Sequence, residues 1–159
     1  MALNAGDTAP DFEAQTDSGS KIRLSDILRE KEVVLYFYPK DETPGCTAEA
    51  CSFRDHWDDI KELGAEVIGI SSDSSESHKK FKEHHQLQFT LVSDGDKEIR
   101  RKYDVKGSIL PPRTTFVISR DGKIAHVYNS QMNAKHHVEE ALNALKKLRI
   151  VGGKQAAQP

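Results

Sequence analysis

The sequence predicts an α/β fold in which helices cover both faces of a central mixed β-sheet. Residues 32–39 form a continuous run of β-branched and aromatic residues, which is typical of a strand buried on both faces of a parallel sheet, and residues 66–72 indicate a second one. The segments between such strands carry apolar residues at helical spacing. Near residue 121 an Asp-Gly pair joins two further strand-like runs and indicates an antiparallel hairpin. Strands that alternate with helices and then end in a hairpin favour a mixed sheet.

The first part of the chain predicts a small hairpin and the first central strand. Residues 11–27 contain two short strand-like pieces around an Asp-Ser-Gly-Ser turn, followed by a short helix near Ser25. A polar loop follows the strand at 32–39, and a helix is expected at about 46–63, with Gly64 ending it. The apolar residues that define this helix are Ala50, Phe53, Trp57 and Ile60.

The second part predicts three more helices. A helix near 75–86 is centred on Phe81, a third strand lies at 89–94, and a short helix follows with Asp96 as its N-cap. The hairpin strands lie within 113–128. The last helix, at about 134–149, places its apolar residues on one face: Val138, Ala141, Leu142, Leu145 and Leu148. Together these elements predict a thioredoxin-like arrangement with an N-terminal β-hairpin.

We expect one domain at residues 1–151 and a disordered tail at 152–159. The 23 basic and 25 acidic residues give a formal net charge of −2, which provides no electrostatic footprint for nucleic acid or an anionic membrane. Residues 1–15 have neither the basic nor the apolar region of a signal peptide, and we find no membrane span. We therefore expect a cytoplasmic protein, in a compartment where a cysteine pair is more often catalytic or metal-binding than structural.

Both cysteines of the chain lie in the segment TPGCTAEAC, residues 43–51. Four residues separate them, which differs from the CxxC of a metal knuckle or a dithiol reductase. Cys46 falls in the first turn of the helix after a central strand, at the carboxyl end of the sheet, where open α/β folds place their sites. Free backbone N–H groups and the helix dipole favour a thiolate there. Cys46 is therefore the candidate nucleophile.

Cys51 lies on the same predicted helix, five residues after Cys46. In an ideal helix their Cα atoms are about 8.5–9 Å apart. A disulfide needs Cα atoms within about 7 Å, so the pair cannot bond while the helix is intact. The first turns of a helix open most easily, and the spacing suggests a redox switch that works by local unwinding. The alternative is that Cys51 is a small core residue.

The segment YPKDETPGCTAEAC, residues 38–51, resembles the active-site stretch of the peroxiredoxins, specifically the Q-type or bacterioferritin comigratory protein group. The resemblance matches Pro39, Thr43 and Cys46 to the family's Pro, Thr and peroxidatic Cys, and Cys51 to a resolving Cys. It also matches Arg113 to an Arg that the family brings in from a later strand. The likeness extends from residue 9 to residue 124. It departs at 106–112, which is short and contains two prolines, and at Ser119, where an acidic residue is common.

This resemblance implies a thiol peroxidase that acts on hydrogen peroxide and organic hydroperoxides. It implies that Cys46 becomes a sulfenic acid, that Cys51 condenses with it, and that thioredoxin or a similar dithiol protein reduces the disulfide. Thr43 and Arg113 are then catalytic residues beside the two cysteines. The resemblance further implies a monomer that needs no cofactor.

Three other residues are expected to line or support the substrate site. Pro39 limits water access and fixes the loop, and the N–H of Gly45 adds to charge stabilisation. Glu49, in the first turn of the helix, is a candidate partner for Arg113. Phe53 and Trp57 are expected in the core rather than at the substrate.

Two alternatives stay open at this point. One is a thioredoxin-like disulfide reductase, which expects CxxC and a proline directly before the facing strand. The other is a non-enzymatic module that binds an anion or a metal at the helix start. The doublets at 84–85 and 136–137 are the remaining metal candidates, but adjacent helical residues diverge by about 100°. We therefore expect solvated histidines and no metal site.

Overall fold

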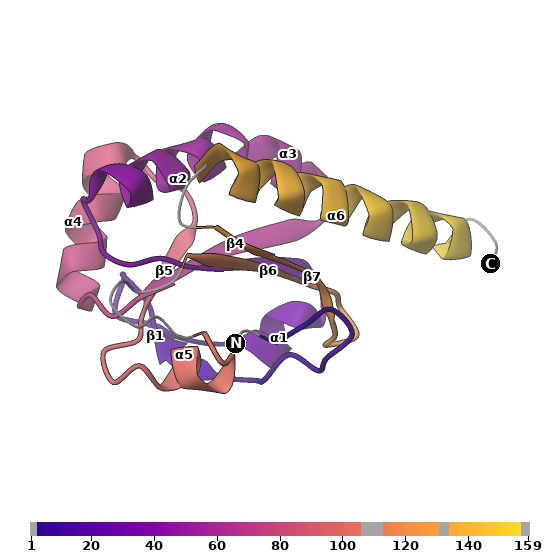
Figure 1. Ribbon diagram of the computed structural model, residues 1–159, viewed down its shortest axis with the longest axis horizontal. Helices are drawn as coiled ribbons and strands as arrows, with labels where there is room; N and C mark the ends of the chain where they lie inside the picture. The colour runs from indigo at the N-terminus through magenta and orange to yellow at the C-terminus, as the bar shows by residue number, and fades with distance from the viewer. Residues whose placement is uncertain (1–2, 106–112, 131–133, 157–159) are drawn as a thin grey trace.

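The computed structural model describes residues 3–105, 113–130 and 134–156 (Figure 1). Within these residues five strands form a central sheet in the order β5-β4-β3-β6-β7. Strands β3, β4 and β5 are parallel, β6 pairs antiparallel with β3, and β7 pairs antiparallel with β6, so the sheet is mixed as predicted. The strands are β3 (Glu32–Phe37), β4 (Ala65–Ser71), β5 (Thr90–Ser93), β6 (Thr114–Ile118) and β7 (Ile124–Asn129).

The predicted N-terminal hairpin is confirmed as a separate two-stranded sheet. Strand β1 (Glu13–Gln15) pairs with β2 (Lys21–Arg23). Gly19 in the turn has a φ of 86°, a left-handed conformation that glycine adopts without a steric cost. The short helix α1 (Leu24–Leu28) follows directly, and the carboxylate of Asp11 accepts hydrogen bonds from both the N–H and the hydroxyl of Ser25.

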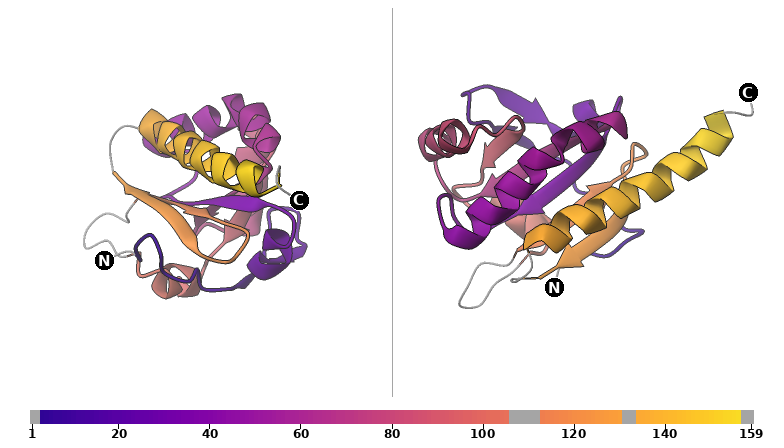
Figure 2. Two further views of the ribbon diagram at one scale, coloured as in Figure 1. Left: turned by 90° about the vertical axis from the view of Figure 1, so that its right-hand side faces the viewer. Right: turned by 90° about the horizontal axis from the view of Figure 1, so that it is seen from above.

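Helices cover both faces of the central sheet (Figures 1 and 2). On one face lie α2 (Pro44–Asp55), α3 (Trp57–Glu62), α4 (Ser75–His85) and α6 (Ala134–Ala156). On the other face lie α1 and α5 (Glu98–Lys102), together with the N-terminal segment. Each face has its own apolar core, and α2 and α6 lie side by side over one of them. None of the helices in the described part of the chain is both long and apolar enough to cross a bilayer.

The predicted helix at 46–63 is two helices in the structure, because the chain bends at His56. The backbone of His56 leaves the helical region, with φ −107° and ψ 11°. Its ring Nδ1 lies 2.9 Å from the carbonyl oxygen of Ser52, which the His56 N–H also approaches. The imidazole thus satisfies a carbonyl at the end of α2 and allows the chain to change direction.

Helix α5 is capped by a different residue from the one predicted. Asp96 accepts a bond from the N–H of Glu98, but the N-cap position is Lys97, which has a φ of 61°. The buried carboxylate of Asp94 accepts from the N–H groups of Ile99 and Arg100. Asp94 therefore does most of the capping from outside the helix.

Helix α6 is longer than the sequence indicates. We expected it to end near 149, and the structure continues it to Ala156, so residues 152–156 are helical rather than disordered. Two glycines at 152 and 153 cost helix stability, but Lys154, Gln155 and Ala156 are good helix formers that continue the hydrogen-bonded turns. The remaining tail, 157–159, lies outside the described residues.

Candidate active site

Cys46 lies at the amino end of α2, where the chain leaves the carboxyl end of β3. Thr43 is the N-cap, in an extended conformation, and Pro44 occupies the first turn, where its missing N–H costs nothing. The first intrahelical bond runs from the N–H of Thr47 to the carbonyl of Thr43. The N–H groups of Gly45 and Cys46 precede this bond, and the Thr43 side chain does not cap them. The Cys46 side chain is buried at this positive helix end.

Arg113 reaches the same point from the sheet. The antiparallel register pairs Phe37, the last residue of β3, with Thr114, the first residue of β6. The residue before Thr114 must therefore lie at the edge of the sheet where α2 begins. Arg113 Nη2 donates to Cys46 Sγ across 3.4 Å. The predicted approach of Arg113 to Cys46 is confirmed.

Glu49 holds the other side of the guanidinium. Arg113 Nη1 donates to Oε1 of Glu49 across 2.6 Å, and neither side chain is more than 6% exposed. Because Glu49 lies one turn after Cys46, a single fork of donors reaches both residues. The Glu49–Arg113 contact expected from the sequence is present. The Glu49 carboxyl is fully buried and contacts the guanidinium of Arg113.

Burial and charge compete at Glu49. A bond to a guanidinium favours the carboxylate, whereas removal from water favours the neutral acid. Burial prevails and raises the pKa of Glu49 to about 8, although Arg113 acts in the opposite direction. For Arg113, burial lowers the pKa and the charges of Glu49 and Cys46 raise it by more, so the guanidinium is cationic. Near neutral pH the site therefore presents an arginine charge that Glu49 only partly offsets.

Gly45 leaves the space that Arg113 occupies. A Cβ atom built on Gly45 would lie 3.0 Å from Nη2 of Arg113, closer than about nine in ten real contacts of that kind. A residue with a side chain here would require the guanidinium to shift by a few tenths of an ångström. Besides the expected role of its N–H, Gly45 therefore has a steric role at the site.

Thr43 and Pro39 border the site on its loop side. The Thr43 hydroxyl donates to the carbonyl of Lys40 across 2.8 Å, so its proton is engaged and its oxygen lone pairs can accept. Of the two roles expected for this hydroxyl, acceptance from the peroxide is the one that the geometry favours. Pro39 is half-buried at the start of the loop.

The loop itself is fixed by a buried carboxylate that sequence reasoning missed. Asp41 is 5% exposed and accepts from the Tyr38 hydroxyl at 2.6 Å and from the Ser77 hydroxyl at 2.9 Å. Nδ1 of His78 lies 2.7 Å from the same carboxylate. Since Tyr38 follows β3 while Ser77 and His78 belong to α4, Asp41 ties the loop to two elements of the scaffold. In the sequence, only the position of Asp41 in the loop before α2 could have indicated this role.

His137 is a second buried residue that the sequence analysis missed. We expected both histidines at 136–137 to be solvated; this is wrong for His137, which is fully buried where α6 packs on the sheet. Its Nε2 donates to the carbonyl of Ser130 at 2.9 Å, which leaves Nδ1 to accept from the Thr115 hydroxyl at 2.7 Å. Nδ1 also lies 3.5 Å from Oε2 of Glu49. Its place one residue before Val138, within the apolar face of α6, was the available signal.

The environment keeps His137 neutral. Burial, together with the charge of Arg113, lowers the pKa of His137 to about 4, even though the bond to Ser130 raises it. A second cation beside Arg113 would be unfavourable in this dry interior. His137 therefore packs against the Glu49–Arg113 pair without adding charge.

Cys51 lies on the same helix as Cys46, and both thiols are free. Cys51 is partly exposed, so it is not a simple core residue. Helix α2 is continuous from Pro44 to Asp55, and the two cysteines therefore have the separation that forbids a direct bond. Phe53 is buried and Trp57 is partly buried against the core, as expected.

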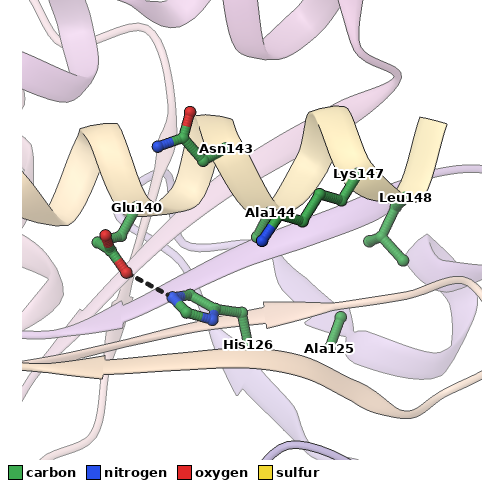
Figure 3. A pocket seen from close by; sticks show the side chains of 7 residues that line it. All are labelled: Ala125, His126, Glu140, Asn143, Ala144, Lys147 and Leu148. Carbon is green, nitrogen blue, oxygen red and sulfur yellow. Dashed lines mark hydrogen bonds and ion pairs between the residues drawn. The ribbon is translucent and has the colours of Figure 1, made fainter. Parts of the chain in front are cut away.

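A surface hollow of about 310 Å³ lies elsewhere, between β7 and α6 (Figure 3). His126 and Glu140 face each other across it, with Nε2 and Oε1 2.7 Å apart. Ala125 and Leu148 supply apolar surface. Its lining includes none of the residues that surround Cys46.

Comparison with known proteins identifies the family. The AhpC/TSA family model matches residues 5–127. Peroxiredoxin Q, chloroplastic, of Sedum lineare is 44% identical over 150 residues, which cover 92% of this chain and 80% of that protein. Among solved structures, the peroxidoxin BcpB of Mycobacterium tuberculosis is 38% identical with a TM-score of 0.87, covering 92% of this chain and 99% of that one.

A third relative is the bacterioferritin comigratory protein of Xanthomonas campestris, which is 31% identical with a TM-score of 0.79 over 86% of this chain and 90% of that one. Its trapped intermediate/ligand complexes concern alkyl peroxide reduction. These relatives argue against a disulfide reductase and against a non-enzymatic module. The chain belongs to the AhpC/TSA family, among the peroxiredoxins of the Q or bacterioferritin comigratory protein group, which are thiol-dependent peroxidases.

Proposed function

We propose that the protein reduces hydrogen peroxide and organic hydroperoxides with Cys46 as the peroxidatic thiol and Cys51 as the resolving thiol. The observation that carries this proposal is the contact between Arg113 Nη2 and Cys46 Sγ at the amino end of α2. The guanidinium donates to this sulfur, and the uncapped N–H groups of Gly45 and Cys46 lie at the same helix start, so both can stabilise the charge that develops during attack on a peroxide.

In the first step the Cys46 thiolate attacks the terminal oxygen of the hydroperoxide. The sulfur lone pair forms the new S–O bond as the O–O bond breaks, which gives a sulfenic acid and an alkoxide or hydroxide that takes up a proton. Arg113 stabilises the charge that develops on the leaving oxygen. The Thr43 oxygen accepts the hydrogen bond of the bound hydroperoxide, since its own proton is given to Lys40.

In the second step the Cys51 thiol condenses with the sulfenic acid. The S–S bond forms, the S–O bond breaks, and the hydroxyl leaves as water with the thiol proton. Because α2 holds the two cysteines apart, its first turns must unwind before this step. Asp41, in the loop before α2, contacts Tyr38, Ser77 and His78. These contacts hold the loop in place while the first turns of the helix unwind.

A dithiol protein then returns the enzyme to its reduced form by thiol–disulfide exchange. Family membership implies a peroxide substrate and a thiol reductant; thioredoxin or a similar protein is our proposal for that reductant. The activity on organic hydroperoxides draws support from the Xanthomonas relative. The monomeric state and the cytoplasmic location stay predictions, and the Sedum relative is named chloroplastic.

Intact mass before and after one equivalent of hydrogen peroxide, with thiol alkylation, tests the cycle. A rapid loss of about 2 Da with no free thiol is expected for a disulfide between Cys46 and Cys51. A stable gain of about 16 or 32 Da would keep Cys46 as the peroxidatic thiol and remove Cys51 from the cycle. No change in mass would contradict both assignments.

A further inference from the structure

Three possible metal ligands converge beside the active-site loop. Glu42 belongs to the loop, and His84 and His85 form the end of α4. Nδ1 of His84 lies 3.1 Å from each oxygen of the Glu42 carboxylate, and Nε2 of His85 lies 2.9 Å from Oε1. The two imidazole rings, expected to diverge, have centroids 4.2 Å apart. One ligand atom from each of the three residues lies within 4.8 Å of the other two.

The scaffold holds these side chains in place. The His85 ring packs edge-on against the buried Phe81, with centroids 5.2 Å apart. Arg54 of α2 donates to the His85 carbonyl at 2.8 Å, and Gln86 ends α4 in a left-handed conformation with φ 54°. His85 is therefore fixed from both sides.

Glu42 has an unusual backbone for a glutamate. Its φ is 65°, in the left-handed region that residues with a side chain adopt at a cost. On one side of it, the buried Asp41 fixes the loop; on the other, Thr43 begins α2. In this conformation the Glu42 carboxylate contacts both imidazoles.

The ligand set and its spacing suit zinc. Zinc binds imidazole nitrogen and carboxylate oxygen at about 2.0–2.2 Å, so tetrahedral ligands lie roughly 3.3 Å apart. The nitrogen–oxygen separations of 2.9–3.1 Å are close to this value. The side chain of His84 is 67% exposed and that of Glu42 is 44% exposed, which leaves a fourth position open to water. The metal would replace the present hydrogen bonds with only small movements.

We propose that Glu42, His84 Nδ1 and His85 Nε2 bind one Zn²⁺ ion and that this ion ties the active-site loop to α4. No residue of the proposed peroxidase cycle is a ligand. The site is therefore a binding site in its own right, on the surface beside the catalytic one.

Zinc at this site has a consequence for the redox cycle, and this consequence rests on the proposed function. Glu42 directly precedes Thr43, the N-cap of the helix that must unwind for Cys51 to reach Cys46. An ion that ties Glu42 to α4 opposes that unwinding. Zinc should slow disulfide formation while the first attack on peroxide, which needs the helix intact, keeps its rate.

Calorimetric titration with Zn²⁺ tests the site, using the full chain with Cys46→Ser and Cys51→Ser so that no thiol competes. One ion per chain is expected. Glu42→Gln and His84→Ala should each weaken the affinity by about tenfold or more. His136→Ala is the matched control, since His136 is an exposed histidine on another helix, and it should bind as the parent does. No stoichiometric binding, or unchanged affinity in a His84→Ala/His85→Ala variant, would overturn the proposal.

The coupling is tested on the chain with both cysteines, by stopped-flow measurement of sulfenic acid and disulfide formation with and without Zn²⁺. Zinc should slow only the disulfide step, and the effect should vanish in Glu42→Gln. Equal slowing in that variant would show zinc acting on the thiols and would overturn the coupling. Since the titration uses a chain without cysteines, failure of the zinc site is distinguishable from failure of the peroxidase cycle.

Discussion

Oε1 of Glu49 lies 2.6 Å from Nη1 of Arg113, and the contact joins the first turns of α2 to the start of β6. The other terminal nitrogen of the same guanidinium, Nη2, donates to Cys46. A planar group held at one end by a buried carboxyl has little freedom at the other. The position of the Arg113 charge beside Cys46 therefore depends on the buried Glu49 carboxyl.

Arg113→Lys should lower kcat/KM for hydrogen peroxide by roughly 10²-fold or more, the loss typical when a donor to a developing oxyanion is removed. Lysine keeps the charge but offers one compact ammonium, which cannot bond Glu49 and Cys46 through a planar fork. Stopped-flow measurement of peroxide reduction checks this. Arg29→Lys is the control, because Arg29 is 79% exposed, and it should leave the rate unchanged. Full activity of Arg113→Lys would show that charge alone suffices.

Glu49→Gln should remove a pH-dependent part of the stability. The folded pKa of Glu49, about 8, exceeds its ordinary value of 4.5, so its contribution is fully present below pH 4.5 and is lost as pH rises towards 8. Glutamine resembles the neutral acid in shape, so the variant should gain stability relative to the parent over this range. Urea unfolding at a series of pH values measures the difference. Glu83→Gln, at an exposed site on α4, is the control and should show no gain that depends on pH. If the stability of Glu49→Gln changes with pH as that of the parent does, the prediction is wrong.

His137→Gln should change how the stability of the protein depends on pH in the acid range. The folded pKa of His137, about 4, is below its ordinary value of 6.5, so stability is full above pH 6.5 and falls as pH decreases to about 4. Between pH 4.5 and 6.5 this trend opposes that of Glu49, and the two partly cancel in the parent protein. The unfolding free energy of His137→Gln should therefore fall less in acid than that of the parent protein. The exposed neighbour provides the control: His136→Gln should keep the parent profile, and if both variants match it, His137 does not titrate as argued.

The fold and the approach of Arg113 to Cys46 could be predicted from the sequence because their signals are local or carried by a motif. The strand 32–39 has an unbroken apolar pattern, and the Thr-Pro-Gly before Cys46 marks a helix start. The match to a peroxiredoxin segment then located Arg113. The break at His56 could not be foreseen, since apolar spacing continues through it and a side-chain bond to Ser52 decides it.

The buried polar residues were beyond sequence reasoning for a different reason. His137 and Asp41 look like ordinary surface residues until the fold brings Thr115 and His78 to them from other elements. Nor does helical spacing foresee that His84 and His85 turn toward one loop residue, because the helix ends there. Such pairings depend on tertiary contacts, which a single sequence does not display.

Gly45→Ala should slow the peroxidase without unfolding the protein. The added Cβ would lie 3.0 Å from Nη2 of Arg113, so the guanidinium must shift by a few tenths of an ångström from its present position. Misplacement of this kind costs on the order of tenfold in kcat/KM. Alanine also favours the helix by up to about 1 kcal/mol, so the unfolding free energy should not fall greatly. Gly95→Ala is the matched control, because no atom lies within 4 Å of its added Cβ. Equal rates for both variants would mean that Gly45 is not required for the approach of Arg113.

Cys51→Ser should separate the two steps of the cycle. Cys46 and its partners are unchanged, so the variant should consume one equivalent of peroxide at the parent rate. The serine hydroxyl cannot condense with the sulfenic acid, and excess peroxide should then convert Cys46 to the sulfinic acid, a gain of about 32 Da. Rapid-quench mass spectrometry with a sulfenic acid probe follows both species. Cys46→Ser, the matched control, should consume no peroxide. If Cys51→Ser instead cycles at the parent rate with thioredoxin, the reductant attacks the sulfenic acid directly, and unwinding of α2 is not needed for turnover.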